Sequence, residues 1–562
     1  MSRLFRFRQY RGRHSASGSR GLPLGGSTVQ EQAGFAAMAG DGSNGKQLTL
    51  LANNSVIKLL GGIANGVFGF ALVVVVARFL HSRGSGAYFE GIALYSLAIS
   101  FALAGADSGL VRMIPRYRAT GRTGDLRSLV WIALIPVVVV GTVMAVVLFV
   151  NAPALGRLLS HHGRSAHLVT TYIRVLVPFI PLGAASTVAL SGTRGFNTMV
   201  PLIAVDNVGK PGLRPVLTVA AVVLGLGAVA VGLAWAAPIA AGLVIALAWL
   251  LILLRRAERR DEGHDVAPRP ARELASEFWR FSAPTAVAQV FQRAILWLDT
   301  LLIGALASTA DAGVYTATTR YILPGLVVMQ GLIVSISPQI SGLISRGQHD
   351  EAKQIYRVST WWVIVVSWPF YLTLIVWAPL LLRVLGHDFE SGQTTMLILS
   401  FAVLVSMAAG PVANVLLMAG HNMWNMVNSM VALALNIALN FILIPRFGIT
   451  GAAIAWMVSI VVSNVAALVE LGVLEALDPF GSGFGAAVVA SSACFGIFGL
   501  IVRLALGPHL FAFVLFGVVA TAAYALVLRK IRGFLHVSEL REAVRPRTLR
   551  AAVRTSAVPP PA

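Results

Sequence analysis

Cations at membrane depth decide which chemistry this sequence offers. Six of them fall within apolar segments long enough to cross a bilayer: Lys58, Arg174, Lys210, Arg214, Arg293 and Arg320. A charged side chain at the bilayer centre costs roughly 2.5–3.5 kcal/mol on insertion scales, so we expect these residues to face a polar cavity rather than lipid. Arginine matches phosphate oxygens with two parallel hydrogen bonds, whereas lysine supplies a point charge. The pattern therefore predicts a binding site for a phosphate-bearing anion.

Acidic and amide side chains accompany these cations at helical spacing. The candidate acids are Asp107, Asp206 and Asp299, and the candidate amides are Gln289 and Gln292. Residues four apart share a helix face, so Asp206, Lys210 and Arg214 are predicted to form one polar stripe, and Gln289 and Arg293 a second. If buried, Asp206 or Asp299 could take up a coupling proton or sodium ion.

Structural roles are open for most of these residues as well. The alternatives are an i,i+4 charge pair for Asp206 with Lys210, a pair of poor geometry for Arg293 with Asp299, interfacial reach for Arg174 and Lys58, and a lock between helices for Asp107. Spacing alone does not choose between these roles and ligand binding.

The composition predicts an all-α integral membrane protein. Mean hydropathy is +0.78, 57% of the 562 residues are hydrophobic and only 12% are charged, whereas soluble domains have about 25% charged residues. Apolar runs of about 20 residues, the length that spans a bilayer, recur along the chain and predict about fourteen transmembrane helices. The single cysteine, Cys494, excludes an intrachain disulfide.

The net charge of +21 resides mainly in loops and tails rather than in a soluble basic domain, so we expect no nucleic-acid partner. Most Lys and Arg residues outside the spans lie on one side, which predicts that both termini are cytoplasmic in the plasma membrane, with a bacterial source favoured by the many arginines. No nucleotide-binding motif occurs, and His161, His162 and His167 have no acidic neighbours. We expect no cofactor and no metal site.

The chain repeats itself, which predicts two lobes of similar structure. SGAYFEGIALYSL at Ser85 aligns with AGVYTATTRYILP at Ala312, and LSGTRGFNTM at Leu190 aligns with LMAGHNMWNM at Leu417, both at an offset of about 227. Parallel repeats of this kind are related by an axis along the membrane normal. The predicted organisation is a disordered basic tail (1–52), a six-helix lobe (53–254), a charged cytoplasmic linker (255–280), a second six-helix lobe (281–475), two additional helices (476–530) and a basic cytoplasmic tail (531–562).

Four segments carry a resemblance to a known family. VVVVARFLHSRGSGAYF, GADSGLVRMIPRYRATGRTGDL, LWLDTLLIGALASTADAGVYTATTRY and IPRFGITGAAIAW together resemble the polysaccharide-biosynthesis (O-antigen or lipid-linked oligosaccharide) flippases of the multidrug/oligosaccharidyl-lipid/polysaccharide exporter superfamily, which includes the MATE-like transporters. The resemblance covers roughly residues 50–475. It implies two six-helix lobes around a central cavity, and translocation of a polyprenyl-diphosphate-linked saccharide by alternating access.

The first functional hypothesis is therefore a flippase for cell-surface polysaccharide assembly, which changes no covalent bond and is not an enzyme. Its expected partners are the lipid-linked saccharide, membrane lipids, a coupling proton or sodium ion and the polysaccharide-assembly machinery. The alternative is a cation-coupled small-molecule or multidrug exporter of the same fold. A membrane glycosyltransferase or polymerase would need catalytic carboxylates in a large loop, where only Asp388 and Glu390 are candidates. An assembly scaffold without transport is a further hypothesis.

Overall fold

The computed structural model describes residues 44–160, 163, 165–260 and 269–531. The predicted tails at 1–43 and 532–562 and the linker residues 261–268 lie outside the described residues. By its contacts the chain divides into two units, Met1–Val56 and Ile57–Ala562. The account below concerns the second unit.

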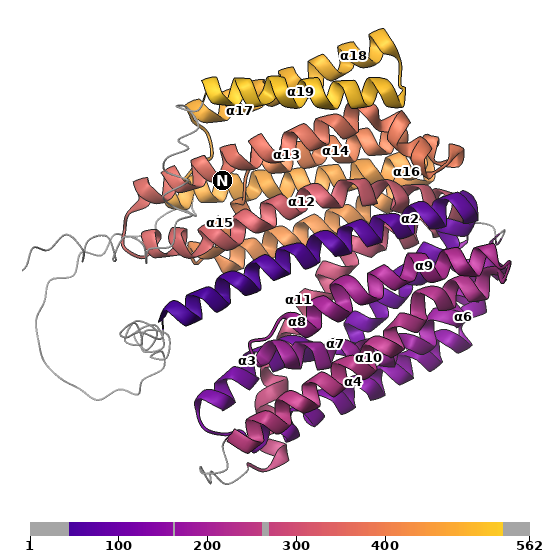
Figure 1. The fold of residues 1–562 in the computed structure, drawn as a ribbon, viewed down its shortest axis with the longest axis vertical. Helices are drawn as coiled ribbons and strands as arrows, with labels where there is room; N and C mark the ends of the chain where they lie inside the picture. Colours follow the sequence, from indigo (N-terminus) through magenta and orange to yellow (C-terminus); the bar gives the residue numbers. More distant parts are fainter. Residues whose placement is uncertain (1–43, 161–162, 164, 261–268, 532–562) are drawn as a thin grey trace, which may run out of the picture. The chain divides into compact units, whose positions relative to one another are not determined.

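Within the described residues the chain is helical throughout and has no strand (Figure 1). The helices before the linker are α2 (Asn44–Leu103), α3 (Ala106–Ala119), α4 (Asp125–Val150), α5 (Ala152–Leu159), α6 (Ala166–Leu176), α7 (Ile180–Gly195), α8 (Val200–Leu202), α9 (Lys210–Val223) and α10 (Gly227–Arg260). A 3₁₀ turn, η2 (Val177–Phe179), joins α6 to α7, and a π-helical segment, η3 (Ile203–Gly209), joins α8 to α9.

The helices after the linker are α11 (Ala271–Leu306), α12 (Thr309–Ile344), α13 (His349–Leu385), α14 (Gln393–Ala408), α15 (Val412–Met418), α16 (Asn422–Glu475), α17 (Ser482–Ser491), α18 (Phe498–Leu506) and α19 (Leu510–Lys530). A 3₁₀ segment, η4 (His387–Gly392), precedes α14, and a π-helical segment, η5 (Ser492–Ile497), joins α17 to α18.

Ten helices in the described part of the chain are long and apolar enough to cross a membrane, so the protein is a multi-pass membrane protein. Two of them, α2 and α16, contain a residue with positive φ at which two helices join: His81 at 57° and Gly448 at 55°. Splitting α2 and α16 at these breaks adds two segments. The helix α12 and the segment from α8 to α9, both predicted to span, are not among the ten. The number fourteen stays a prediction.

The helices form two groups by their contacts. Helix α7 contacts α3, α4 and α10, helix α10 also contacts α6 and α9, and Tyr88 of α2 packs against Tyr172 of α6; we call α2–α10 the amino-terminal group. Helix α13 contacts α12 and α14, and α16 contacts α11 and α14; we call α11–α16 the carboxy-terminal group. Helix α11 also contacts α3, α4 and α5. Helix α11 therefore lies against both groups, and polar residues along it are placed at their boundary.

The two groups cross closely where α2 meets the start of α12. Gly86 and Gly313 are both buried there, and a Cβ atom added to Gly86 would lie 2.6 Å from the carbonyl carbon of Thr309 and 3.1 Å from the backbone nitrogen of Gly313. Only glycine allows two helix backbones to approach this closely. We call Gly86, Thr309 and Gly313 the glycine crossing.

Polar contacts close the same end of the molecule. Arg78 Nε donates to the carbonyl of Val384 at 2.7 Å and its Nη2 donates to the carbonyl of Arg383 at 3.2 Å. The Ser82 backbone N–H donates to Asp388 Oδ2 at 3.4 Å. These bonds join α2 to the last turn of α13 and to η4, so this end is held by hydrogen bonds as well as by backbone packing.

The additional helices pack on α13. Trp361 and Trp377 of α13 share an apolar cluster with Phe516 and Tyr524 of α19, and α17–α19 lie beyond α13 in Figure 1. Tyr524 donates its hydroxyl proton to the carbonyl of Val365 at 2.9 Å. The segment 476–530, predicted to hold two additional helices, contains α17–α19, which contact α13 of the carboxy-terminal group; that it is a separate addition stays a prediction.

Candidate functional site

Trp297 of the boundary helix α11 contacts the guanidinium of Arg320, which lies on α12. Arg293 and Trp297 are four residues apart on α11 and therefore share a face, and the Arg293 side chain is exposed. Arg320 of α12 places its guanidinium 4.8 Å from the centre of the Trp297 ring, in a cation–π contact. The next aromatic residue of α12, Tyr321, stacks edge-on against Phe70 of α2 at 4.9 Å. Arg320 thus contacts a residue that shares a face of α11 with Arg293 by helical spacing, and the role of both arginines as ligands stays a prediction.

Asp299 lies six residues beyond Arg293 on α11 and is turned into the protein. It is 4% exposed, accepts a hydrogen bond from the Tyr315 hydroxyl at 3.0 Å through Oδ2, and accepts one from Asn440 Nδ2 at 2.7 Å through Oδ1. Asn440 also donates to Asn436 Oδ1 at 3.1 Å. Asp299 is therefore held by α12 and α16, and no described ion pair joins it to Arg293, so a structural pair between these two is not formed.

Lys210 and Arg214 are placed inside the amino-terminal group. Lys210 Nζ lies 2.7 Å from Asp206 Oδ1 and 2.9 Å from the Ser186 hydroxyl, and its side chain is 11% exposed. Arg214 stacks on the Trp235 ring at 4.0 Å, and its Nε donates to the Trp235 carbonyl at 3.1 Å. The i,i+4 charge pair is thus present. Lys210 is thus neutralised within the group, whereas Arg214 uses only Nε in its described hydrogen bond, and the role of both as substrate ligands stays a prediction.

Gln289 and Asp107 meet across the boundary between α11 and α3. Gln289 Nε2 donates to the Ser108 hydroxyl at 2.8 Å and to Asp107 Oδ2 at 3.3 Å. Gly105, just before α3, has φ 76°, and a Cβ atom there would overlap the backbone carbonyl of Ser282 of α11. The contact between helices that was one alternative for Asp107 is therefore observed.

The remaining predicted ligands are not brought to this face by described contacts. Arg174 is exposed and lies 5.8 Å from the centre of the Phe149 ring. Lys58 lies in α2 and Gln292 in α11, but both side chains fall outside the described side chains. For these three residues substrate binding stays a prediction.

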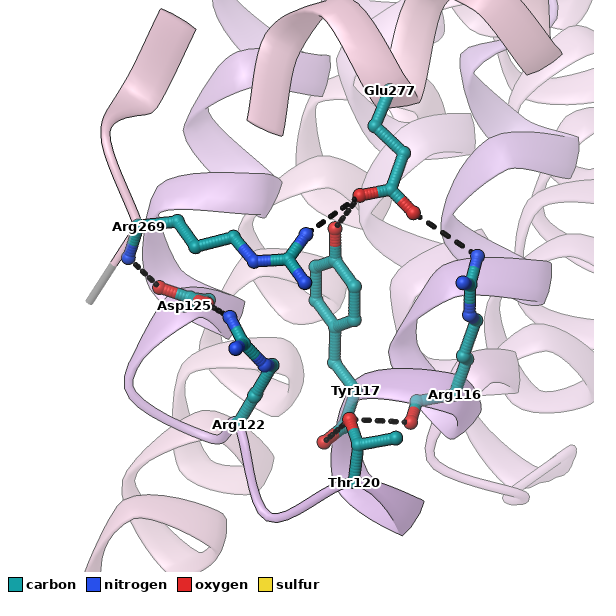
Figure 2. A network of polar contacts seen from close by, with 7 residues as sticks. All are labelled: Arg116, Tyr117, Thr120, Arg122, Asp125, Arg269 and Glu277. Atoms are coloured by element: carbon teal, nitrogen blue, oxygen red, sulfur yellow. Dashed lines mark hydrogen bonds and ion pairs between the residues drawn. The ribbon is translucent and has the colours of Figure 1, made fainter. Parts of the chain in front are cut away.

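Near the linker, Figure 2 shows a network of hydrogen bonds and ion pairs around Glu277. The carboxylate of Glu277 accepts from Arg116 Nη1 at 3.0 Å, from the Tyr117 hydroxyl at 3.0 Å and from Arg269 Nη1 at 3.1 Å. Partial burial and the bond to Glu277 raise the pKa of Tyr117 to about 12, which keeps its hydroxyl a proton donor at physiological pH. The Glu277 carboxylate of α11 therefore binds α3 and Arg269, which lies two residues before α11.

Asp125 extends this network to the start of α4. It is 3% exposed, accepts from the Arg269 backbone N–H at 3.0 Å and lies 3.6 Å from Arg122 Nη1. We call the six residues that make these contacts the linker junction: Arg116, Tyr117, Arg122, Asp125, Arg269 and Glu277. Through Asp125, the junction also joins the start of α4 to Arg269.

A cavity of about 550 Å³ lies beside the linker junction, between α3 and α11. Its charged lining comes from both helices: Arg112 and Arg116 from α3, and Glu273, Glu277 and Arg280 from α11. The guanidinium of Arg112 stacks over the Phe281 ring at 4.3 Å, so part of the wall is aromatic. We call this space the α3–α11 cavity. Its volume falls within the range of about 300–1,000 Å³ usual for small-molecule sites.

Comparisons with known sequences agree on one superfamily. A family model described as polysaccharide biosynthesis protein matches residues 51–338, which is about half of the chain, and a model described as MatE matches residues 284–442. A probable low-salt glycan biosynthesis flippase, Agl15 of Haloferax volcanii, is 22% identical over 226 residues. That match covers 40% of this chain and 46% of the relative, so the chain spans under half the length of the curated relative it matches.

Two solved structures share the fold. The lipid II flippase MurJ in an inward closed conformation superposes with a TM-score of 0.64 at 13% identity, covering 85% of this chain and 100% of that one. A multidrug resistance MATE family transporter of the MOP superfamily, in an inward-facing conformation, gives a TM-score of 0.58 at 15% identity, covering 78% and 98%. The arrangement of helices is therefore that of these transporters.

Proposed function

We propose, from the premise that this chain belongs to the polysaccharide biosynthesis protein family, that it translocates a polyprenyl-diphosphate-linked saccharide across the cytoplasmic membrane. The protein would change no covalent bond and would act by alternating access between the two helix groups. The relative from Haloferax volcanii is a probable glycan biosynthesis flippase, which supports a glycan-bearing substrate.

The observation that carries the proposal is the contact of Arg320 with Trp297, a residue that shares a face of α11 with Arg293. Two cations on this side of α11 repel each other unless an anion or water lies between them, and neither charge is stable against lipid. A diphosphate supplies the missing negative charge, and each guanidinium offers a planar fork that fits two phosphate oxygens. Because α11 lies against both helix groups, a headgroup bound here would contact the boundary that has to rearrange.

The glycine crossing supplies the closed end of the proposed cycle. With Gly86 packed on Thr309 and Gly313, the two groups are in contact far from the linker, and with cytoplasmic termini this closed end would face outward. A headgroup arriving from the cytoplasmic side would bind at Arg293 and Arg320. Parting of the crossing would then release it outside.

Asp299 is the residue we assign to ion coupling, in preference to Asp206. Lys210 already neutralises Asp206 at 2.7 Å, whereas Asp299 is buried among the neutral partners Tyr315, Asn436 and Asn440. A buried carboxylate without a cation is stabilised by taking up a proton or a sodium ion. Since these partners come from α12 and α16, ion uptake would bear on the packing of the carboxy-terminal group.

The test is translocation of lipid-linked saccharide to the outer leaflet by Arg293→Gln and Arg320→Gln variants. Each substitution removes charge-assisted hydrogen bonds of about 1.5–3 kcal/mol, so we expect transport at limiting substrate to fall at least about tenfold. Arg157→Gln, at an exposed arginine of α5, is the matched control and is expected to transport normally. Normal transport by both test variants at normal protein levels would refute the proposed site.

A small-molecule exporter is the second candidate, because the MatE model covers residues 284–442, including Asp299. Exporters of cationic drugs would require an acidic cavity, whereas this part of the protein carries Arg293 on α11 and Arg320 on α12. A drug-efflux assay on cells expressing the chain separates the two functions. Efflux of cationic compounds, abolished by Asp299→Asn, together with no movement of lipid-linked saccharide would favour the exporter.

A further inference from the structure

The α3–α11 cavity has the composition of an anion site. Arg112 and Arg116 are four residues apart and share a face of α3, and Arg280 adds a third guanidinium from α11. All three side chains are exposed, and no ion pair within the described part of the chain engages Arg112 or Arg280. Arg116 uses one nitrogen, Nη1, in its contact with Glu277, while a guanidinium carries five N–H donors. Donors for further acceptors are therefore present.

The position of the cavity suits a lipid headgroup. The apolar segments of the sequence are predicted to end near residue 108 on one chain segment and to begin near residue 281 on the other. Arg112 is about 6 Å beyond the first limit at the α-helical rise, and Arg280 is at the second. Arg112 and Arg280 are therefore predicted to lie at the depth where the phosphates of membrane lipids are found, with Arg116 about one helical turn beyond Arg112. The aromatic wall, Phe281, faces the same space.

The linker junction connects this site to the bonds that hold α11 against α3. Glu277 is part of the cavity lining and is at the same time the acceptor for Arg116, Tyr117 and Arg269. A phosphate held by the remaining donors of Arg116 would lie beside the Glu277 carboxylate, and the two anions would repel each other. Arrival of the phosphate would weaken one of the three bonds by which α11 is held to α3 and to Arg269.

We propose that the α3–α11 cavity binds the phosphate groups of a phosphorylated lipid, and that this phosphate displaces Glu277 from Arg116. Identification of the lipid as the diphosphate-linked cargo rests on the proposed function. The cavity is then a first docking site on the linker side, separate from Arg293 and Arg320. Binding there loosens the linker junction before the headgroup moves between the helix groups.

The experiment measures binding of polyprenyl diphosphate to the full chain in nanodiscs by native mass spectrometry. Loss of two bidentate arginines in the Arg112→Gln/Arg280→Gln variant is expected to weaken binding at least about tenfold. Arg118→Gln is the matched control: Arg118 is an exposed α3 arginine that stacks on Phe196 rather than lining the cavity. Equal affinity of the double variant and the control overturns the site.

Displacement of Glu277 is tested by a pair of charge-neutralising variants. Glu277→Gln and Glu273→Gln remove the same charge from the cavity lining, but only the first frees Arg116. We expect Glu277→Gln to bind polyprenyl diphosphate more tightly than Glu273→Gln, by about threefold or more for one released hydrogen bond. Equal affinities of these two variants overturn the displacement step.

The source of the phosphate and the folding of the variants are controlled separately. Displacement of bound polyprenyl diphosphate by equimolar phosphatidylglycerol would overturn the link to the cargo and assign the cavity to bulk anionic lipid. If the glutamine double variant does not fold, Arg112→Lys/Arg280→Lys keeps the charge and loses the bidentate geometry, and unchanged binding by it overturns the site. Because binding is measured without transport, its failure leaves the proposed function standing, and a chain that binds but does not translocate overturns only that function.

Discussion

The glycine crossing predicts that a single methyl group at Gly86 opens one end of the molecule. A Cβ atom at Gly86 would overlap the carbonyl oxygen of Thr309 and approach the Gly313 nitrogen to 3.1 Å. The obstructing atoms belong to the backbone, so no rotamer change relieves the overlap and the two helices must separate. Inserting a methyl group into a packed interface costs about 1–3 kcal/mol. This cost applies only while the crossing is closed.

The Gly86→Ala variant should therefore lower the ratio of closed to open molecules by a factor of about 5 to 150. Spin labels on cysteines introduced at Arg83 and Ser391, both exposed near this end, report the separation by pulsed electron spin resonance once Cys494 is replaced. We expect a longer or broader distance distribution than for the unsubstituted chain.

Gly69→Ala is the matched control. Gly69 lies on the same helix, and a Cβ atom there meets nothing within 4 Å. Alanine is a better helix former than glycine by about 1 kcal/mol, so this variant should keep the original distances and be slightly more stable. If Gly86→Ala and Gly69→Ala give the same distance distribution, the crossing does not hold the two groups together and the reasoning fails.

Two further predictions concern carboxylates. Replacing Asp299 by Asn keeps its size but leaves an amide nitrogen facing either Tyr315 or Asn440, so transport should fall at least about tenfold and lose its response to an imposed proton or sodium gradient in proteoliposomes; a retained response would refute coupling at Asp299. Although partial burial raises the pKa of Asp478, hydrogen bonds from Lys353 and Arg357 outweigh it and hold this pKa below the ordinary value. The stabilisation is present above the ordinary pKa of about 3.9 and is lost as pH falls through the lower folded-state value. Asp478→Asn should therefore lower the free energy of unfolding in detergent at neutral pH by about 1 kcal/mol or less, seen as a lower melting temperature. It should have no effect once the pH is below the folded-state pKa of Asp478.

Much of the architecture follows from patterns within short windows of sequence. Apolar length predicts membrane helices, and the repeat that aligns Ser85 with Ala312 also aligns Gly86 with Gly313. The structure adds that these two equivalent glycines touch. A repeat identifies equivalent positions but does not say which of them meet, because contact depends on how the two groups are placed.

Partners of the site residues were harder to predict, because they come from distant parts of the chain. Spacing joined Lys210 to Asp206 correctly, but the third member, Ser186, is 24 residues away on another helix. Asp299 receives a hydrogen bond from Asn440, 141 residues further on. Helical periodicity states which residues share a face of one helix, and it contains no information about which helix covers that face.

Glu277 illustrates a second limit of sequence reasoning. Within a stretch rich in arginine it is typical of a solvated charged linker, and nothing in its neighbourhood marks it as a junction between helices. Its three partners are Arg116, Tyr117 and Arg269. A tyrosine and an arginine on the same turn of α3 could have suggested an acceptor nearby, but not which of the acids supplies it.

The kink in α13 has a consequence for the last helices of the chain. Trp377 departs from helical geometry two residues before Pro379, and the neighbouring carbonyl of Val376 accepts a hydrogen bond from Arg503 of α18 at 2.6 Å. Arg503 of α18 thus stabilises the bend by this hydrogen bond, and Phe516 of α19 packs against Trp377. If α13 moves during the proposed transport cycle, α18 and α19 must move with it. A chain shortened before α17 would therefore lose helices that support the bend in α13, not merely peripheral ones.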